Sequence, residues 1–252
     1  MVLARFRMPA LAVTIGAAVT VPLLSLAPAQ AAAGGNVGGR GPASARASAP
    51  SVINNTVFAG YKASVAAGSP TSSAAQFYVP RLSCTSAFRG ITPGAGVQVN
   101  AFRSVSFAFV FVLCHSGRAA YVPALVINGN EVNYPRMAVR AGNVIKVSAK
   151  VTTTGTTVQV TNVTTGVTRK RTGPGARSSD AFAGDNAVDS NGVLGVPSFG
   201  TLTFTHCLID GRALARSHPA RYQRVNSRHV VQIATGALSS GGTAFPTSYK
   251  HF

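Results

Sequence analysis

The sequence predicts an all-β domain in which many short strands form an antiparallel sandwich or barrel. Three observations favour this fold class. The chain is rich in Val, Thr, Phe, Tyr, Gly and Ser, a composition typical of strands and turns. Apolar residues alternate with a period of two, and nothing repeats at helical spacing for long. Turn residues such as Asn128-Gly129 and Thr154-Gly155 separate the apolar runs at short intervals, which favours antiparallel pairing.

The length and composition predict one folded domain after an exported leader. A 252-residue chain with 46% hydrophobic residues can bury a substantial core, and we expect the domain to span residues 52–252. Residues 1–31 have the layout of a secretory signal peptide, with an apolar run and the cleavage site Ala29-Gln30-Ala31. Residues 32–51 predict a flexible Gly/Ala/Ser/Pro linker. We therefore expect a secreted protein with no transmembrane segment in its mature chain.

Ten runs within the domain have the pattern of strands. The run Ser106–Leu113 is apolar on both faces, which is typical of a central strand that is covered on each side. Thr92-Pro93-Gly94 predicts a turn. The predicted strands are Thr56–Ala63, Ser73–Val79, Gly96–Phe102, Ser106–Cys114, Arg118–Asn128, Asn143–Thr152, Thr156–Asn162, Thr201–Cys207, Arg228–Ala234 and Thr243–Tyr249.

Three cysteines, Cys84, Cys114 and Cys207, allow three pairings. Export favours oxidation of two of them. We favour Cys84 with Cys114, because both close strands that should lie in the same half of the domain. Cys207 is then expected to be a buried free thiol.

The charge is strongly basic, with 23 Lys and Arg against 5 Asp and Glu and a formal net charge of +18. Such a surface attracts polyanions, among them anionic cell-surface polymers and anionic membrane surfaces, whereas export makes nucleic acid an improbable partner. A basic surface that only keeps a secreted protein soluble explains the same charge equally well. Arg169-Lys170-Arg171, followed by Gly173-Pro174-Gly175, predicts a basic turn that could bind phosphate groups. The densest predicted basic patch consists of Arg212, Arg216, Arg221, Arg224 and Arg228.

The segment 177–204 gathers three of the five acidic residues, Asp180, Asp185 and Asp189. Asp185, Asp189 and Asn191 vaguely resemble a calcium loop, but the series of acids at odd positions and the closing Glu are missing. The five histidines show no pairing at metal-ligand spacing. The sequence therefore predicts neither a metal nor another cofactor.

Several blocks carry a resemblance to a known family, and all occur in the family's order. They are FAGY at 58–61, SSAAQFYVP at 72–80, the segment 139–166, RSS at 177–179 with FGTLTF at 199–204, and ATGALSSGGTAF at 234–245. Together they resemble the eqolisin or glutamic peptidase (peptidase A4-like) family, with Phe58 in place of a Trp. The resemblance implies a sandwich of two curved antiparallel sheets of the concanavalin A-like or jelly-roll type.

The resemblance also implies where a catalytic pair should lie. In the family a Glu acts as general base and a Gln steadies the oxyanion. The family's Glu position falls on Ala181, and Asp180 is the neighbouring carboxylate. Adjacent strand residues point to opposite faces, so Asp180 can substitute only if a bulge or a register slip intervenes. The strand expected to carry the Gln, Arg118–Asn128, has none, and Gln98 lies on the other side of the run Ser106–Leu113.

Two hypotheses follow from these departures and from the complete absence of Trp. The first is a secreted pseudoenzyme, similar to glutamic peptidases, that binds an anionic extracellular polymer or a polypeptide without cleaving it. The alternative is an active acid endopeptidase that uses Asp180, with Gln98, in a shifted register. The side-chain directions at Asp180 and Ala181 distinguish the two hypotheses. Ala181 on the concave face of the sheet, with Asp180 on the other face, would count against the enzyme.

Overall fold

A computed structural model of the chain describes residues 51–99, 104–186, 188–189, 192–193 and 195–250. The predicted signal peptide and all but the last residue of the predicted linker lie outside the described residues. The elements are β1 (Val52–Asn55), β2 (Phe58–Ser64), β3 (Thr71–Tyr78), β4 (Arg89–Val99), β5 (Ser104–His115), β6 (Arg118–Ile127), β7 (Asn130–Asn133), β8 (Val144–Val151), β9 (Thr156–Asn162), β10 (Val167–Gly173), β11 (Ser178–Asn186), β12 (Val188–Asp189), β13 (Gly192–Val193), β14 (Thr201–Ile209), β15 (Arg212–Ala213), the 3-10 helix η1 (Leu214–Ser217), β16 (Ala220–Val225), β17 (Val231–Thr235) and β18 (Phe245–Tyr249).

Hydrogen bonds join sixteen strands into one continuous sheet in the order β10-β9-β8-β3-β14-β18-β17-β16-β2-β11-β4-β5-β6-β7. β15 pairs with β14, while β1 adds to β16 as a parallel neighbour. β12 and β13 form a separate two-stranded ribbon. In the described part of the chain no helix is long and apolar enough to span a membrane.

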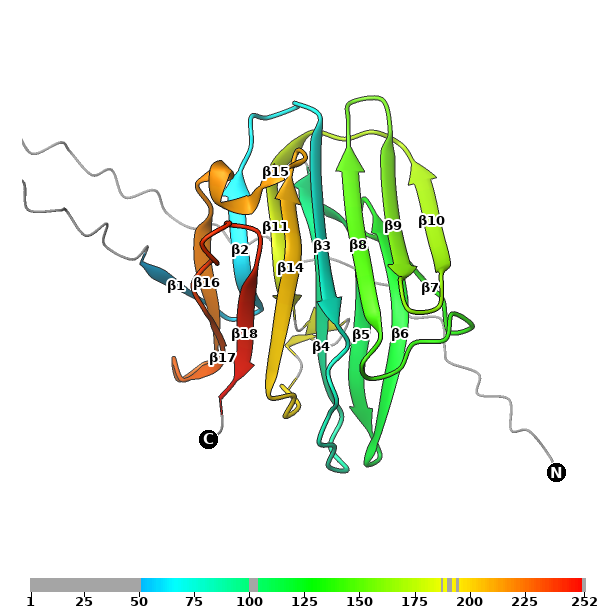
Figure 1. Cartoon of the computed structure of the whole chain (residues 1–252), viewed down its shortest axis with the longest axis vertical. Coiled ribbons are helices and arrows are strands. Elements are labelled where there is room, and N and C mark those ends of the chain that lie inside the picture. The colour runs from blue at the N-terminus through cyan, green and yellow to red at the C-terminus, as the bar shows by residue number, and fades with distance from the viewer. Residues whose placement is uncertain (1–50, 100–103, 187, 190–191, 194, 251–252) are drawn as a thin grey trace, which may run out of the picture. The chain divides into compact units, whose positions relative to one another are not determined.

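The long sheet folds back on itself into two packed layers. β4 contacts β3 and β8, and β5 contacts β8 and β9, although none of these pairs are neighbours in the sheet. Figure 1 shows β8 and β9 in front of β5 and β6. The predicted two-layer antiparallel β-sandwich is therefore confirmed.

The core between the layers follows from the alternation of buried and exposed side chains in strands such as β8. In β8 the side chains of Ile145, Val147, Ala149 and Val151 are buried, whereas Lys146 and Lys150 are exposed. Such a period of two places one face of the strand against the opposite layer. Aromatic rings fill the centre, where Phe204 stacks on Phe245 with ring centroids 5.0 Å apart.

The predicted central strand is β5, which lies between β4 and β6. Its Ala108, Val110 and Val112 enter the core between the layers. Its Phe107, Phe109 and Phe111 lie on the opposite face with Ala124 and Val126 of β6, in a second and smaller apolar cluster. The core-facing residues of β5 are thereby fully covered, whereas on the opposite face Phe109 is buried and Phe107 and Phe111 are half-buried.

Two predicted turns are strands in the structure. Thr92-Pro93-Gly94 lies inside β4, where Pro93 pairs with Asp185 of β11. On the side of β5, Ile91 and Gly94 have pairing partners but Thr92 and Pro93 do not. This gap in the ladder accommodates Pro93, which has no N–H group to donate.

The segment Arg169-Lys170-Arg171 belongs to β10, the terminal strand of the sheet order. The Nη1 atom of Arg171 donates to the carbonyl of Leu125 over 3.0 Å and to the carbonyl of Asn130 over 2.8 Å. Arg171 thus connects β10 to β6 and β7 at the other end of the sheet order.

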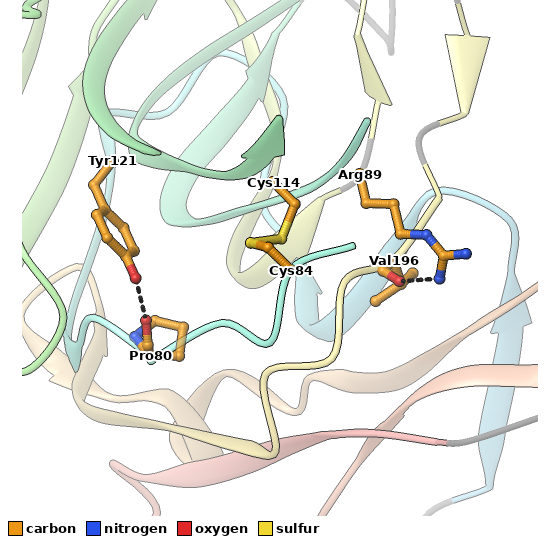
Figure 2. The surroundings of a disulfide bond; sticks show 6 residues. All are labelled: Pro80, Cys84, Arg89, Cys114, Tyr121 and Val196. Atoms are coloured by element: carbon orange, nitrogen blue, oxygen red, sulfur yellow. Dashed lines mark hydrogen bonds between the residues drawn. A yellow bond between two sulfur atoms is a disulfide. The ribbon is translucent and has the colours of Figure 1, made fainter. Parts of the chain in front are cut away.

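The predicted disulfide joins Cys84 to Cys114, at the end of β5 (Figure 2). Two hydrogen bonds near the disulfide hold neighbouring loops: Tyr121 donates to the carbonyl of Pro80 over 3.1 Å, and Arg89 donates to the carbonyl of Val196 over 3.4 Å. Cys207 is a buried free thiol, and burial raises its pKa to about 12. Its thiolate, the reactive form, is therefore strongly disfavoured.

Candidate functional site

The two residues that separate the hypotheses, Asp180 and Ala181, point to opposite faces of β11. Ala181 is fully buried in the core between the layers. Asp180 faces the other way, toward Ser64 of β2 and Gln98 of β4. The position that the resemblance assigns to the family's Glu therefore does not lie on the same face as Asp180.

A β-bulge produces this direction of Asp180. Ser178 pairs with Val99 and Asp180 pairs with Gln98, so two steps along β11 match one step along β4. In a regular strand Ser178 and Asp180 would share a face. Here the Ser178 hydroxyl instead lies 2.9 Å from the Thr71 hydroxyl of β3, in the opposite layer. The bulge required by the alternative hypothesis is therefore present immediately before Asp180.

Asp180, Gln98, Lys62 and Ser64 form a polar cluster on this face. The Lys62 ammonium donates to Gln98 Oε1 over 3.3 Å. Ser64 Oγ donates to Asp180 Oδ1 over 3.2 Å, and Ser179 Oγ donates to Asp180 Oδ2 over 3.1 Å. Because Gln98 accepts through its oxygen, its amide nitrogen is left to donate to another group. The cluster therefore combines a carboxylate, an amide donor and a cation.

The electrostatics of Lys62 couple this cluster to nearby aromatic rings. Burial lowers the pKa of Lys62, and the charge of Asp180 opposes that shift by favouring the ammonium form. The ammonium lies 5.7 Å from the ring centroid of Phe58 and 5.6 Å from that of Tyr222, within the range of cation–π attraction. Two rings and one amide thus fix the position of the Lys62 charge.

A continuous series of rings extends from this cluster across β16, β2, β11 and β5. Neighbouring ring centroids lie 5.8 Å apart for Tyr222 and Phe58, 5.8 Å for Phe58 and Phe182, and 6.1 Å for Phe182 and Phe107. Phe107 then stacks on Phe109 at 4.4 Å, and Phe109 meets Phe111 edge-on at 4.7 Å. We call the side of β2, β4, β5 and β11 that carries these rings the aromatic face.

Glycine permits the rings to lie close to the sheet. Gly60 and Gly184 are paired on β2 and β11, and each has a positive φ. A Cβ atom on Gly184 would lie 2.3 Å from the Ala59 carbonyl oxygen and 2.8 Å from the Phe58 ring. The ring of Phe58 therefore occupies the space that a side chain would need.

Asp185 lies on the core side of β11 and is not part of this cluster. It is fully buried, and Thr247 Oγ1 donates to its Oδ2 over 2.5 Å, while its Oδ1 has no hydrogen-bond partner among the described residues. Burial raises the pKa of Asp185 to about 7, although Thr247 and the cation of Arg224 act against the shift. A buried strand residue cannot belong to a surface calcium loop.

The other residues of the vague calcium pattern add no support for a metal site. Asn191 lies outside the described residues. The described residues contain no group of three His, Cys, Asp or Glu side chains that could hold a metal ion.

The predicted basic patch is divided between surface and core. Arg212, Arg216 and Arg228 are exposed, and Arg221 is half-buried beside Tyr61. Arg224 is only 1% exposed and lies near Asp185. Arg224 therefore does not belong to a surface patch. Its Nε donates to the carbonyl of Thr56 over 3.3 Å, and a register irregularity between Arg224 and Val225 interrupts the pairing of β16 with β17 at this point.

The burial of Arg224 also changes the pKa of its guanidinium. Desolvation lowers the pKa of Arg224 to about 10, and the charge of Asp185 acts in the opposite direction. No motif in the sequence links these two residues, which lie 39 positions apart on β11 and β16. Only the tertiary structure reveals the pair.

The chain is similar to known proteins in both sequence and fold. The family model described as the peptidase A4 family matches residues 56–245. Among curated proteins, no sequence matches. Scytalido-glutamic peptidase, solved with a transition state analog inhibitor, is 18% identical and has a TM-score of 0.61, and the match covers 77% of this chain and 100% of that one.

Two further solved structures have the same fold. SCP-B, a member of the eqolisin family solved with the tripeptide Ala-Ile-His, is 18% identical over 77% of this chain and 100% of its own, with a TM-score of 0.57. The aspergilloglutamic peptidase from Aspergillus niger is 18% identical over 64% of this chain and 99% of its own, with a TM-score of 0.54.

Proposed function

We propose that this chain, which belongs to the peptidase A4 family, hydrolyses peptide bonds in acid with Asp180 and Gln98 as its catalytic pair. The observation that supports the proposal is the bulge before Asp180, which sets Asp180 in register with Gln98 of the neighbouring strand on the aromatic face. These are the two chemical groups that the family mechanism requires, a carboxylate and an amide. They stand on adjacent strands, as a shared reaction site needs.

In the proposed reaction Asp180 acts as general base and Gln98 stabilises the oxyanion. The carboxylate takes a proton from a water molecule as the water oxygen attacks the peptide carbonyl carbon. The Gln98 amide nitrogen donates to the carbonyl oxygen as it becomes negative. The proton on Asp180 then passes to the leaving nitrogen as the C–N bond breaks. Lys62 holds Gln98 Oε1 and so keeps the amide nitrogen directed away from itself.

Cleavage of a denatured protein substrate in acid tests this function. Asp180→Asn keeps the size of the side chain but removes the base, and we expect turnover to fall by at least about 100-fold, as for loss of a positioned base. Glu131→Gln is the matched control, because it removes the only Glu of the chain from β7, four strands and roughly 19 Å from β11. Equal activity of wild type and Asp180→Asn would contradict the proposal.

A second candidate is a binding protein without catalysis, and the surroundings of Asp180 favour it. Asp180 is only 4% exposed, and both of its carboxylate oxygens accept hydrogen bonds from serines. A polypeptide could then bind along the aromatic face without reaching the carboxylate. Binding of a denatured polypeptide with no cleavage at any acid pH, in wild type and Asp180→Asn alike, would support this candidate over the first.

We also propose that the protein is exported. The predicted leader at residues 1–31 motivates this, and the Cys84–Cys114 disulfide is typical of oxidising compartments. Mass spectrometry of protein from the culture medium is expected to find a mature N-terminus at Ala32. Retention of an intact leader inside the cell would argue against export.

A further inference from the structure

The outer side of the second layer, remote from Asp180, carries a flat array of polar side chains. In β8, β9 and β10 the residues that alternate with the buried core are almost all Thr, Ser, Gln or Lys. We call this the threonine–lysine face. It consists of Ser72 and Gln76 of β3, Lys146, Ser148 and Lys150 of β8, Thr157, Gln159 and Thr161 of β9, and Thr168, Lys170 and Thr172 of β10.

Strand register fixes the three lysines of this face in a triangle. Lys146 and Lys150 lie four residues apart on β8, which corresponds to roughly 14 Å. Lys170 pairs with Gln159, and Gln159 pairs with Ser148, the residue midway between the two β8 lysines. Two strand spacings place the Lys170 backbone about 10 Å from Ser148. All three lysines are exposed, so their charges stand on a rigid base at regular intervals.

Hydroxyl and amide groups occupy the positions between the lysines. Thr161 and Thr168 share a hydrogen bond of 3.0 Å, and the Gln159 amide donates to Thr161 Oγ1 over 3.3 Å. These groups can donate to and accept from the hydroxyls of a ligand. The face therefore alternates point cations with neutral hydrogen-bonding groups.

Negative charge is scarce around the triangle. Asp180, Asp185 and Glu131 lie on strands of the other layer. Asp210 follows β14 at one corner, where it accepts hydrogen bonds from the Ser72 backbone nitrogen over 2.6 Å and from the Ser72 hydroxyl over 3.4 Å. The described side chains of this face thus leave an excess of positive charge.

We infer that the threonine–lysine face binds a linear polymer in which phosphodiester groups alternate with hydroxylated segments, as in an anionic polyol-phosphate of a cell wall. Lysine ammonium groups bind phosphates as compact point charges, and the hydroxyl and amide groups suit the segments between them. Tyr78 of β3 is the exposed aromatic residue beside this face, whereas binding of single-stranded nucleic acid relies on repeated aromatic platforms. The inference does not depend on the peptidase proposal, because the face belongs to the other layer.

Binding of the full chain to immobilised poly(glycerol phosphate), measured across a range of salt concentrations, tests the inference. The triple variant Lys146→Gln, Lys150→Gln, Lys170→Gln is compared with Arg212→Gln, Arg216→Gln, Arg228→Gln, which removes the same charge from exposed residues elsewhere. We expect the lysine variant to bind at least 10-fold more weakly than wild type. The slope of a plot of log K against the logarithm of the salt concentration should become less steep by about two. The arginine variant should lose less than 3-fold.

A second pair of measurements separates a polyol-phosphate from other polyanions. Thr161→Val with Thr168→Val removes two hydroxyls and keeps strand-forming side chains. We expect this variant to weaken binding of poly(glycerol phosphate) and to leave binding of a single-stranded oligo(dT) unchanged. Equal losses for the lysine and arginine variants, retention that does not depend on salt, or tighter binding of oligo(dT) by wild type would each overturn the inference. Thermal melts of all variants, expected to match wild type, exclude unfolding as the cause.

Discussion

Asp180 on β11 lies directly opposite Gln98 on β4, and Lys62 on β2 holds the oxygen of that glutamine. Replacing Gln98 by Ala removes the amide that is proposed to donate to the oxyanion. Because this hydrogen bond forms only in the transition state, we expect kcat to fall about 10²–10³-fold with little change in KM. Steady-state kinetics in acid provide the measurement. Gln232→Ala, on β17 and outside both proposed sites, is the control, and an equal fall in that variant would contradict the assignment.

Lys62 is predicted to position Gln98 without contacting the reacting atoms. Lys62→Met keeps much of the packing against Phe58 and Tyr222 but cannot donate to Gln98 Oε1. We expect the side-chain amide signals of Gln98 to move in an NMR spectrum of Lys62→Met and to remain near their wild-type positions in Lys62→Arg. Unchanged amide signals in Lys62→Met would show that the hydrogen bond does not order the glutamine.

Asp185 is predicted to make the domain more stable in acid. Its pKa is raised to about 7 in the folded protein, whereas an unfolded Asp titrates near 3.9. The folded state therefore holds this proton more tightly, so stability is greatest below the unfolded pKa and declines as pH rises through 4 toward 7. A shift of this size corresponds to about 4 kcal/mol.

Asp185→Asn provides the comparison that isolates this contribution. The amide resembles the protonated carboxyl group, so the variant should match wild type near pH 4 and exceed it near pH 8. Urea unfolding at a series of pH values measures the difference. A constant difference between the two proteins across this range would contradict the role of Asp185.

The disulfide is predicted to stabilise the domain mainly by restricting the unfolded chain. Cys84 and Cys114 are 30 residues apart, and closing a loop of that size contributes roughly 3–4 kcal/mol in the chain-entropy model. Reduction should lower the free energy of unfolding by that amount. Cys207→Ala is the control, since its thiol is free and its removal should leave the response to reductant intact.

Alternation along single strands allowed much of the fold to be predicted from the sequence. β9 has the predicted bounds, Thr156–Asn162, because Val158 and Val160 alternate with polar residues between two turns. The pairing of Cys84 with Cys114 was predicted from the strands that the two cysteines close. The family resemblance rested on blocks from Phe58 to Phe245, within the strands that build both layers.

The candidate site was harder to predict, because it depends on one extra residue in a ladder. The bulge between Ser178 and Asp180 reverses which residues of β11 face outward, and neither side chain signals it. The burial of Arg224 near Asp185 depends on where β16 and β11 lie in the folded sheet. Local patterns determine strands, but the direction of a side chain after an irregularity depends on both neighbouring strands.

Arg171 has a consequence for how this protein behaves at high concentration. β10 and β7 end the sheet order, and such terminal strands expose backbone groups to which another chain could add. The guanidinium of Arg171 spans from β10 to the carbonyls of Leu125 and Asn130, and so draws both terminal strands together. This link between the two terminal strands disfavours the addition of another chain at that edge, so we expect loss of the Arg171 guanidinium to promote association at high protein concentration.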